Sequence, residues 1–263
     1  TWAPAAVLVD HPAKIPAEGG EQPRPAPRAA LPTTKNTPEL APTDPQQDTV
    51  VDGLLQLMGQ AKKDLLIVSP YFVPGPDMKQ AFAAARARGV RVRVLTNSLA
   101  SNDAPIAHAG YARHRPELLA TGLELYEMRS ELSGLRSVFQ GTGSSGVTGS
   151  SGDSKAMLHS KLLILDGRLL VIGSMNLDLR SQLQNTEIAL LIRSRSLSAR
   201  ATEQIEAALE DAAWRVEQDS EGRLVWRAPK DSGLKDATAE PDTSAPLRWL
   251  VRILGWFAPD HLL

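Results

Sequence analysis

Four polar side chains close together in the sequence could act together on a phosphodiester. They are His159 and Lys161, followed by Ser174 and Asn176. A histidine can act as a nucleophile or as a general acid near neutral pH. The lysine would supply positive charge to phosphoryl oxygens, and the serine and asparagine would supply directed hydrogen bonds. This set predicts phosphoryl-transfer chemistry that requires no metal ion and no other cofactor.

A β-hairpin would place these four side chains on one face of a sheet. Residues two apart in a strand point to the same side, so the side chains of His159 and Lys161 would share one side, and so would those of Ser174 and Asn176. Asp-Gly at 166–167 is a strong signal for a two-residue hairpin turn, which would pair position 159 with position 174. A two-residue loop one position later would keep the set together, whereas a three-residue loop would break the arrangement.

Structural explanations compete with the functional ones. A lone histidine is usually a core residue satisfied by a hydrogen bond, but burying an unpaired lysine beside it is costly, which favours function for His159 and Lys161. Asp166 is better explained as a turn residue, because Asp is favoured in hairpin turns and this one lies at the far end of the strand. Four more residues could line a cleft, but packing and capping explain each nearly as well: Tyr71, Asn97, His108 and Tyr111.

The spacing of these residues resembles the HKD motif of the phospholipase D superfamily. The pattern is His159-x-Lys161-x4-Asp166 followed by Gly-Ser174-x-Asn176. The resemblance implies that the first three residues are catalytic and that Ser174 and Asn176 bind phosphate. It also implies that Glu187 is the acidic residue that orients the motif histidine; a surface carboxylate on a strand is the alternative.

Further stretches narrow the resemblance to the C-terminal half of a bacterial cardiolipin synthase of the C type. It covers roughly residues 64–192. A synthase of this kind carries two HKD motifs, and this sequence has one, so we expect an N-terminal half to be missing. The stretches are Ser69-Pro-Tyr-Phe-Val-Pro-Gly75, Gly89-Val-Arg-Val-Arg-Val-Leu-Thr-Asn-Ser98, His108-Ala-Gly-Tyr111 and Asn176-Leu-Asp-Leu-Arg-Ser181.

The elements that must position these residues alternate between helix and strand. This alternation predicts an α/β fold, a sandwich with a mixed β-sheet flanked by helices and one HKD half. Expected helices are 50–58, 77–88, 103–114 and 197–216, and expected strands are 65–68, 90–95, 123–126, 157–165, 169–173 and 186–192.

Composition divides the chain into four parts. Residues 1–47 are expected to be a disordered or extended Pro-rich arm, because such a stretch cannot bury enough apolar surface to offset its ordering entropy. A catalytic half-domain follows at 48–228, with a Gly/Ser-rich loop at 130–155. A linker is expected at 229–245 and an amphipathic C-terminal helix at 246–263. That helix could lie in a bilayer interface, or dock on the missing half or on this core.

Net charge and cysteine content limit which partners and metal sites the protein can have. The net charge of the 263 residues is -1, without the basic field that gathers nucleic acid, so we do not expect a nucleic-acid partner. The absence of cysteine excludes disulfides and thiolate metal sites. Nothing in the sequence resembles a signal peptide or a membrane span. The first residue is Thr1, and we expect a fragment or a processed product.

These expectations combine into one function and two alternatives. The resemblance implies a phosphatidyltransferase half that forms a phosphohistidine intermediate, acts on a phospholipid such as phosphatidylglycerol, and binds a bacterial membrane surface peripherally. Its partner would be the missing N-terminal HKD half or a second copy. The alternatives are a phosphodiesterase or nuclease built as a dimer of single-motif halves, and an inactive fragment that needs its N-terminal half.

Overall fold

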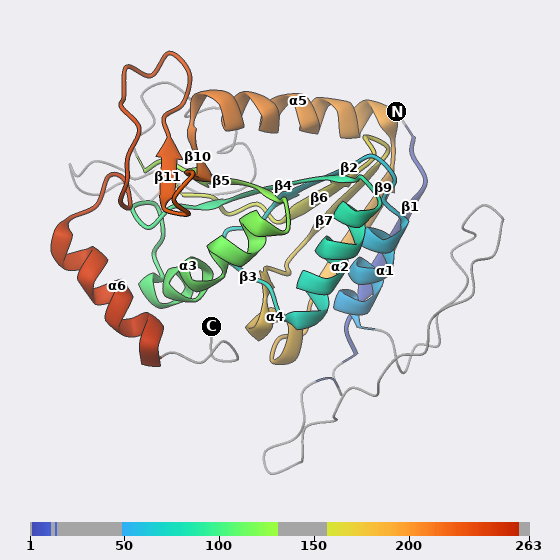
Figure 1. The fold of residues 1–263 in the computed structure, drawn as a ribbon. Helices are drawn as coiled ribbons and strands as arrows, with labels where there is room; N and C mark the ends of the chain where they lie inside the picture. The colour runs from blue at the N-terminus through green and yellow to red at the C-terminus, as the bar shows by residue number, and fades with distance from the viewer. Residues whose placement is uncertain (1, 12–13, 15–48, 131–156, 258–263) are drawn as a thin grey trace, which may run out of the picture.

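A mixed β-sheet forms the centre of the molecule (Figure 1). The computed structural model describes residues 2–11, 14, 49–130 and 157–257. The central strands β2, β4 and β5 run parallel, and the strands outside them are antiparallel to their neighbours. In sheet order the nine strands of this sheet are β1 (Ala5–Val9), β9 (Ile188–Arg193), β7 (Leu169–Gly173), β6 (Leu162–Leu165), β2 (Asp64–Val68), β4 (Arg91–Asn97), β5 (Glu124–Met128), β10 (Ala213–Gln218) and β11 (Leu224–Arg227).

Helices cover both faces of the sheet, so the expected α/β fold with a helix-flanked mixed sheet is confirmed. Helices α1 (Val50–Gln60), α2 (Pro76–Ala87) and α3 (Pro105–Ala120) lie on one face, and α5 (Arg195–Asp211) lies on the other (Figure 1). A second, two-stranded sheet joins β3 (Phe72–Val73) to β8 (Leu177–Asp178), which leads into the short helix α4 (Leu179–Leu183). Each face has its own buried apolar cluster.

The long helix expected at 197–216 is shorter than predicted. Helix α5 ends at Asp211, and β10 begins at Ala213. Trp214 and Val216 are buried, whereas Arg215 between them is exposed. This alternation has the period of a strand and overrides the helical pattern before it.

The N-terminal residues correct the expected boundary of the Pro-rich arm. The expected arm includes residues 5–9, but these residues form β1, which pairs with β9 from Ala5↔Ile192 to Val9↔Ile188. The buried Asp10 then accepts a hydrogen bond from the N–H of Val50 at 2.6 Å, at the start of α1. A carboxylate is favourable there because the first N–H groups of a helix lack partners. Residues 15–48 lie outside the described residues, as does the expected loop after Ser130.

The segment expected to be a linker, 229–245, packs on the domain. Ala237 exchanges two main-chain hydrogen bonds with Trp226, at 2.8 and 2.9 Å. Glu240 forms an ion pair with Arg115 of α3, whose side chain is buried. The amphipathic helix that follows is α6 (Ala245–Phe257), and it lies against α3 (Figure 1). The remainder of the expected helix, 258–263, lies outside the described residues.

Candidate active site

The expected site residues, apart from Asp166, gather at one end of the sheet. Strands β2, β4 and β7 end there, and β6 and β9 begin there, because the latter two run antiparallel to their neighbours. His159 and Lys161 precede β6, Ser174 and Asn176 follow β7, and Glu187 precedes β9. Three connections between different strands therefore meet at the same edge.

The hairpin between β6 and β7 has a three-residue loop, so the expected two-residue turn was wrong. Leu165 pairs with Leu169, and Leu162 pairs with Ile172, which leaves residues 166–168 as the loop. Asp166 stays attached to β2, since its N–H donates to the carbonyl of Asp64 at 2.9 Å, and its φ of 50° lies in the left-handed region. The loop thus begins at residue 166, as expected, but ends one residue later, at Arg168, which a hairpin considered alone does not show.

The polar residues lie beyond the paired part of this hairpin. The last main-chain hydrogen bond between its two arms runs from the N–H of Gly173 to the carbonyl of Lys161, at 3.1 Å. Ser174 bonds instead to β9: its N–H donates to the carbonyl of Ile188 at 3.0 Å, and its Oγ accepts from the N–H of Ile188 at 3.1 Å. The direction of these side chains therefore depends on β9 and not on hairpin alternation.

Glu187 brings Ser174 and Lys161 together. The hydroxyl of Ser174 donates to the Glu187 carboxylate, and the side-chain amide of Asn185 donates to it at 3.4 Å. Burial lowers the pKa of the Lys161 ammonium, while the carboxylates of Glu187 and Asp178 oppose this shift. Lys161 thus lies within electrostatic reach of two carboxylates. This half-buried lysine, the serine hydroxyl and Glu187 form one cluster. Contacts with Glu187 and β9 hold it together, and not the expected two-residue hairpin.

His159 lies at the exposed side of this cluster. His159 is exposed, and its imidazole makes no hydrogen bond within the part of the chain that the structure describes. Its main-chain carbonyl accepts a hydrogen bond from Nζ of Lys161 at 3.2 Å. The exposed imidazole is accessible to a substrate, and the Lys161 ammonium contacts the main chain of the same residue. The expected contact between Glu187 and His159 is not among the hydrogen bonds of the described residues, and the orienting role stays a prediction.

Asn97, at the end of β4, fixes the main chain directly before His159. Its Oδ1 accepts from the N–H of Leu158 at 2.9 Å, and its Nδ2 donates to the carbonyl of the same residue at 3.3 Å. Both residues are buried. Sequence reasoning noted Asn97 only as a weak cleft candidate, because a side chain that bonds the main chain of another segment leaves no local signal.

Asn176 is half-buried, and its Oδ1 atom is buried without a hydrogen-bond partner in the described part of the chain. An unpaired buried amide oxygen is costly, and such groups in native structures call for a functional or structural explanation. The expected role of Asn176 in phosphate binding remains a prediction.

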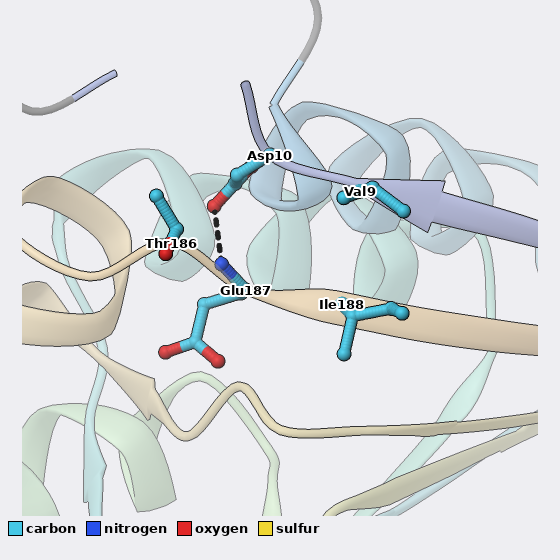
Figure 2. Close-up of a pocket in the computed structure, with 5 residues that line it drawn as sticks. All are labelled: Val9, Asp10, Thr186, Glu187 and Ile188. Carbon is cyan, nitrogen blue, oxygen red and sulfur yellow. Dashed lines mark hydrogen bonds between the residues drawn. The ribbon is translucent and has the colours of Figure 1, made fainter. Parts of the chain in front are cut away.

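Asp10 was missed by sequence reasoning and positions Glu187. Figure 2 shows its carboxylate accepting from the N–H of Glu187, at 3.0 Å, and its own N–H donates to the Glu187 carbonyl at 2.9 Å. Together with Val9, Thr186 and Ile188 these two residues line an open depression of about 270 Å³. The contact joins residues 177 positions apart, so no local pattern could indicate it.

Asp166 does not reach this cluster. It lies at the opposite end of β6, and its carboxylate accepts from the main-chain N–H groups of Lys62, Lys63 and Asp64 at 2.8–3.2 Å. Burial would raise its pKa, but these hydrogen bonds outweigh burial and lower it. We therefore assign Asp166 to anchoring the turn on β2, as its residue type suggested, and not to the chemistry that the family resemblance implied.

A family model described as "Cardiolipin synthase, PLD-like domain" matches residues 54–209. The chain belongs to the phospholipase D-like family. The matched residues include His159 and the whole cluster of Lys161, Ser174 and Glu187, whereas Asp10 lies outside them; the family inferred from the sequence is confirmed.

Individual relatives within the phospholipase D-like family agree with this assignment. Cardiolipin synthase C of Escherichia coli K12 is 38% identical over 214 residues, covering 80% of this chain and 43% of that protein. An uncharacterized Helicobacter pylori protein is 32% identical over 191 residues, covering 72% of this chain and 35% of that protein. The chain thus spans less than half the length of these two relatives.

A solved structure supports the phospholipase D-like fold. Phosphatidylserine synthase from Haemophilus influenzae superposes with a TM-score of 0.52 at 15% identity, covering 81% of this chain and 44% of that one. Among the described residues, no helix has the length and apolar character needed to cross a membrane. The same residues contain no group of three His, Cys, Asp or Glu side chains arranged to hold a metal ion.

Proposed function

We propose that this chain is one half of a phosphatidyltransferase of the cardiolipin synthase type, acting on phosphatidylglycerol through a phosphohistidine intermediate. The observation that supports it best is the cluster of Lys161, Ser174 and Glu187 beside the exposed His159, in a chain that belongs to the phospholipase D-like family. An ammonium and a hydroxyl next to a free imidazole suit a phosphodiester, whose negative oxygens need positive charge and hydrogen-bond donors.

The proposed reaction needs two histidines, of which His159 is one. In the first step one histidine attacks phosphorus, the bond from phosphorus to the glycerol oxygen breaks, and the other, protonated histidine gives its proton to that oxygen. In the second step a hydroxyl of another phosphatidylglycerol attacks the phosphohistidine and passes its proton to the second histidine, and the phosphorus–nitrogen bond breaks. The products are cardiolipin and glycerol, and both histidines return to their starting states.

An exposed apolar surface beside the site supports a second half of the same family as the partner. Five side chains of β1, β9 and β7, each at least 38% exposed, lie on the face of the sheet that α5 covers elsewhere. Strand pairing places them next to one another, and two of them line the depression beside Glu187. The surface consists of Val7, Val9, Ile172, Ile188 and Leu190.

An apolar surface of this kind is typical of interaction sites. We propose that it contacts another phospholipase D-like half, which would place that half's histidine near His159. The lengths of the relatives are consistent with this, because the chain spans less than half of each.

A chimera tests the proposal. In it this chain replaces the matching part of E. coli cardiolipin synthase C, and thin-layer chromatography follows labelled phosphatidylglycerol. We expect cardiolipin and glycerol, a loss of at least about a thousandfold in His159→Ala, and no effect of a chelator. His114→Gln, on α3, is the matched control and should keep full activity. Phosphatidic acid as the main product, or activity retained in His159→Ala, would refute the transferase assignment.

The apolar surface has its own test in the same system. If the two halves are produced as separate chains, Ile188→Asp should weaken their co-purification at least about tenfold, because a buried unpaired charge is costly. Leu197→Asp, at an exposed position on α5, is the control and should leave co-purification unchanged.

A further inference from the structure

Helix α6 has an inner face that attaches it to the domain. Leu247, Val251 and Leu254 follow helical spacing and contact Leu99 and Ala109, the latter on α3. The side chain of Arg113 also donates to the carbonyl of Gly255, at 2.9 Å. The sequence left open where this helix docks, and its inner face docks on this core.

The outer face of the same helix is apolar and exposed. Trp249, Leu250 and Ile253 are 65%, 49% and 52% exposed. Ile253 lies four residues after Trp249 and three after Leu250, and residues at these spacings are neighbours on a helix surface, so the three side chains form one patch. Isolated exposed apolar residues are ordinary, but a patch that includes a tryptophan on an amphipathic helix is typical of an interaction surface.

Helix α6 is positively charged, and its arginines form no ion pair with a carboxylate in the described part of the chain. The sequence 245–257 contains two arginines and no acidic residue. Among the described residues, Arg248 donates to neutral oxygens alone, the carbonyl and the hydroxyl of Thr243, at 2.6 and 3.2 Å. Arg252 is exposed and pairs with no carboxylate of the described residues. The patch is therefore flanked by two positive charges that remain available to an anionic partner.

The helix is also connected to the active-site edge. Its inner face contacts Leu99, two residues after Asn97, and Asn97 holds the main chain of Leu158 directly before His159. A partner that binds the outer face of α6 is thereby placed on the side of the molecule where β4 ends.

We propose that the outer face of α6 docks on the surface of an anionic phospholipid bilayer, with Trp249, Leu250 and Ile253 in the interface and Arg248 and Arg252 near the headgroups. Tryptophan and aliphatic side chains on one face, with arginines and no acid, match the chemistry of such helices. A second protein half would not require the uncompensated arginines. The inference deepens the proposed function, because it supplies the surface from which a lipid phosphodiester would reach the site.

Sedimentation with vesicles tests the inference without any measurement of activity. The full chain should bind vesicles of equal parts phosphatidylcholine and phosphatidylglycerol, and bind phosphatidylcholine alone much less. Trp249→Ser/Leu250→Ser/Ile253→Ser should reduce binding at least about tenfold, since each side chain loses its favourable transfer from water. Arg252→Glu should reduce binding to the mixed vesicles about fivefold or more, because a cation near an anionic surface is replaced by an anion.

The control variant changes two exposed apolar residues elsewhere, Leu197→Ser/Leu234→Ser, which are 39% and 40% exposed, and it should bind like the unmodified chain. Circular dichroism and light scattering accompany each variant. The inference is overturned if the unmodified chain does not bind mixed vesicles, or if the triple variant binds them equally well. It is also overturned if the triple substitution converts a dimer into a monomer, since the patch would then bind a second copy. Inactivity of the chimera would leave this result unaffected.

Discussion

Asn97 bonds both main-chain polar groups of Leu158, the residue directly before His159, and so connects the end of β4 to the chain that carries the imidazole. The exposed His159 ring has no hydrogen bond of its own among the described residues, so its position depends on main-chain contacts, of which this one holds the preceding residue. A buried side chain that bonds an N–H and a carbonyl at once holds that residue in both distance and rotation.

Asn97→Leu is therefore expected to lower kcat of the chimeric enzyme about 10- to 100-fold with little change in KM, because a small displacement of a reacting group has effects of this size. Asn97 would be a positioning residue, acting through Leu158. The substitution should also destabilise the chain by about 2 kcal/mol, since it leaves two buried main-chain groups unpaired.

The control for Asn97 is Ser194→Ala, which removes the N-cap of α5 at the other end of β9. It should cost about 1 kcal/mol of stability and leave kcat unchanged. An Asn97→Leu enzyme with normal kcat and higher KM would show that Asn97 does not position the histidine.

Asp166 provides a second, purely structural prediction. Asp166→Ala should reduce the free energy of unfolding by about 2–3 kcal/mol, because main-chain N–H groups of residues 62–64 lose their acceptor. Asp166→Asn should cost about 1 kcal/mol, since an amide oxygen still accepts and Asn tolerates a positive φ. Both variants should keep chimera activity within a few-fold. Arg168→Ala, which removes an ion pair whose arginine side chain is 51% exposed, is the control and should cost less than about 1 kcal/mol.

The pH dependence of stability checks the same residue. The pKa of Asp166 is lowered in the folded chain, so its carboxylate stabilises the fold above its ordinary pKa of 3.8, and this contribution is lost as the pH falls through the folded-state pKa. Urea denaturation between neutral and acidic pH should show a smaller loss of stability in Asp166→Asn than in the unmodified chain. Equal slopes would contradict the assignment.

Two possible roles of Glu187 predict shifts in different limbs of the pH profile of kcat/KM. Its carboxylate raises the pKa of Lys161 against the lowering effect of burial, so Glu187→Gln should lower the Lys161 pKa further. If the ammonium is required, the alkaline limb of kcat/KM should then move to lower pH. If Glu187 instead orients His159, the acidic limb should move. Asp178→Asn, which removes the other carboxylate acting on Lys161, should move the alkaline limb in the same direction as Glu187→Gln.

The sequence predicted the central sheet because its strands are buried apolar runs, and β2 and β4 lie where they were expected. It singled out His159 and Lys161 because an imidazole and an ammonium two positions apart have few structural explanations, whereas Glu187 came from the family resemblance. It did not predict the hairpin register, since the main chain of Asp166 bonds to β2 and not within the hairpin.

Contacts between distant segments account for the other differences. Strand β1 and Asp10 depend on β9 for their partners, and an isolated stretch of Ala and Val beside a Pro-rich region carries no sign of that pairing. Glu240 lies in a segment whose composition is that of a linker, and only the folded chain shows that it meets Arg115.

Arg115 is the centre of a buried polar network. It pairs with Glu127 at 3.2 Å, with Glu240, and with Nε2 of His108 at 3.1 Å. Glu127 also accepts from Nε1 of Trp226 at 2.9 Å. Burial raises the pKa of the Glu127 carboxyl despite Arg115; for Glu240, burial also favours a higher pKa, but Arg115 and His108 outweigh it and lower the pKa. The network thus joins α3 and β5 to the segment that leads into α6.

Arg115→Met should therefore destabilise the chain by about 3–5 kcal/mol, because it leaves two carboxylates near one another in the interior without their cation. Glu240→Gln should cost only about 1–2 kcal/mol, since Arg115 keeps Glu127 as its partner. The effects of the two substitutions on the free energy of unfolding should not add, because losing the arginine is less costly when one carboxylate is already neutral. The double variant should be at least about 1 kcal/mol more stable than the sum of the single effects predicts. Urea denaturation of the four proteins measures this coupling. Strictly additive effects would mean that Glu240 and Arg115 do not interact in solution, and that the segment 229–245 is attached to the domain by its contacts with Trp226 instead.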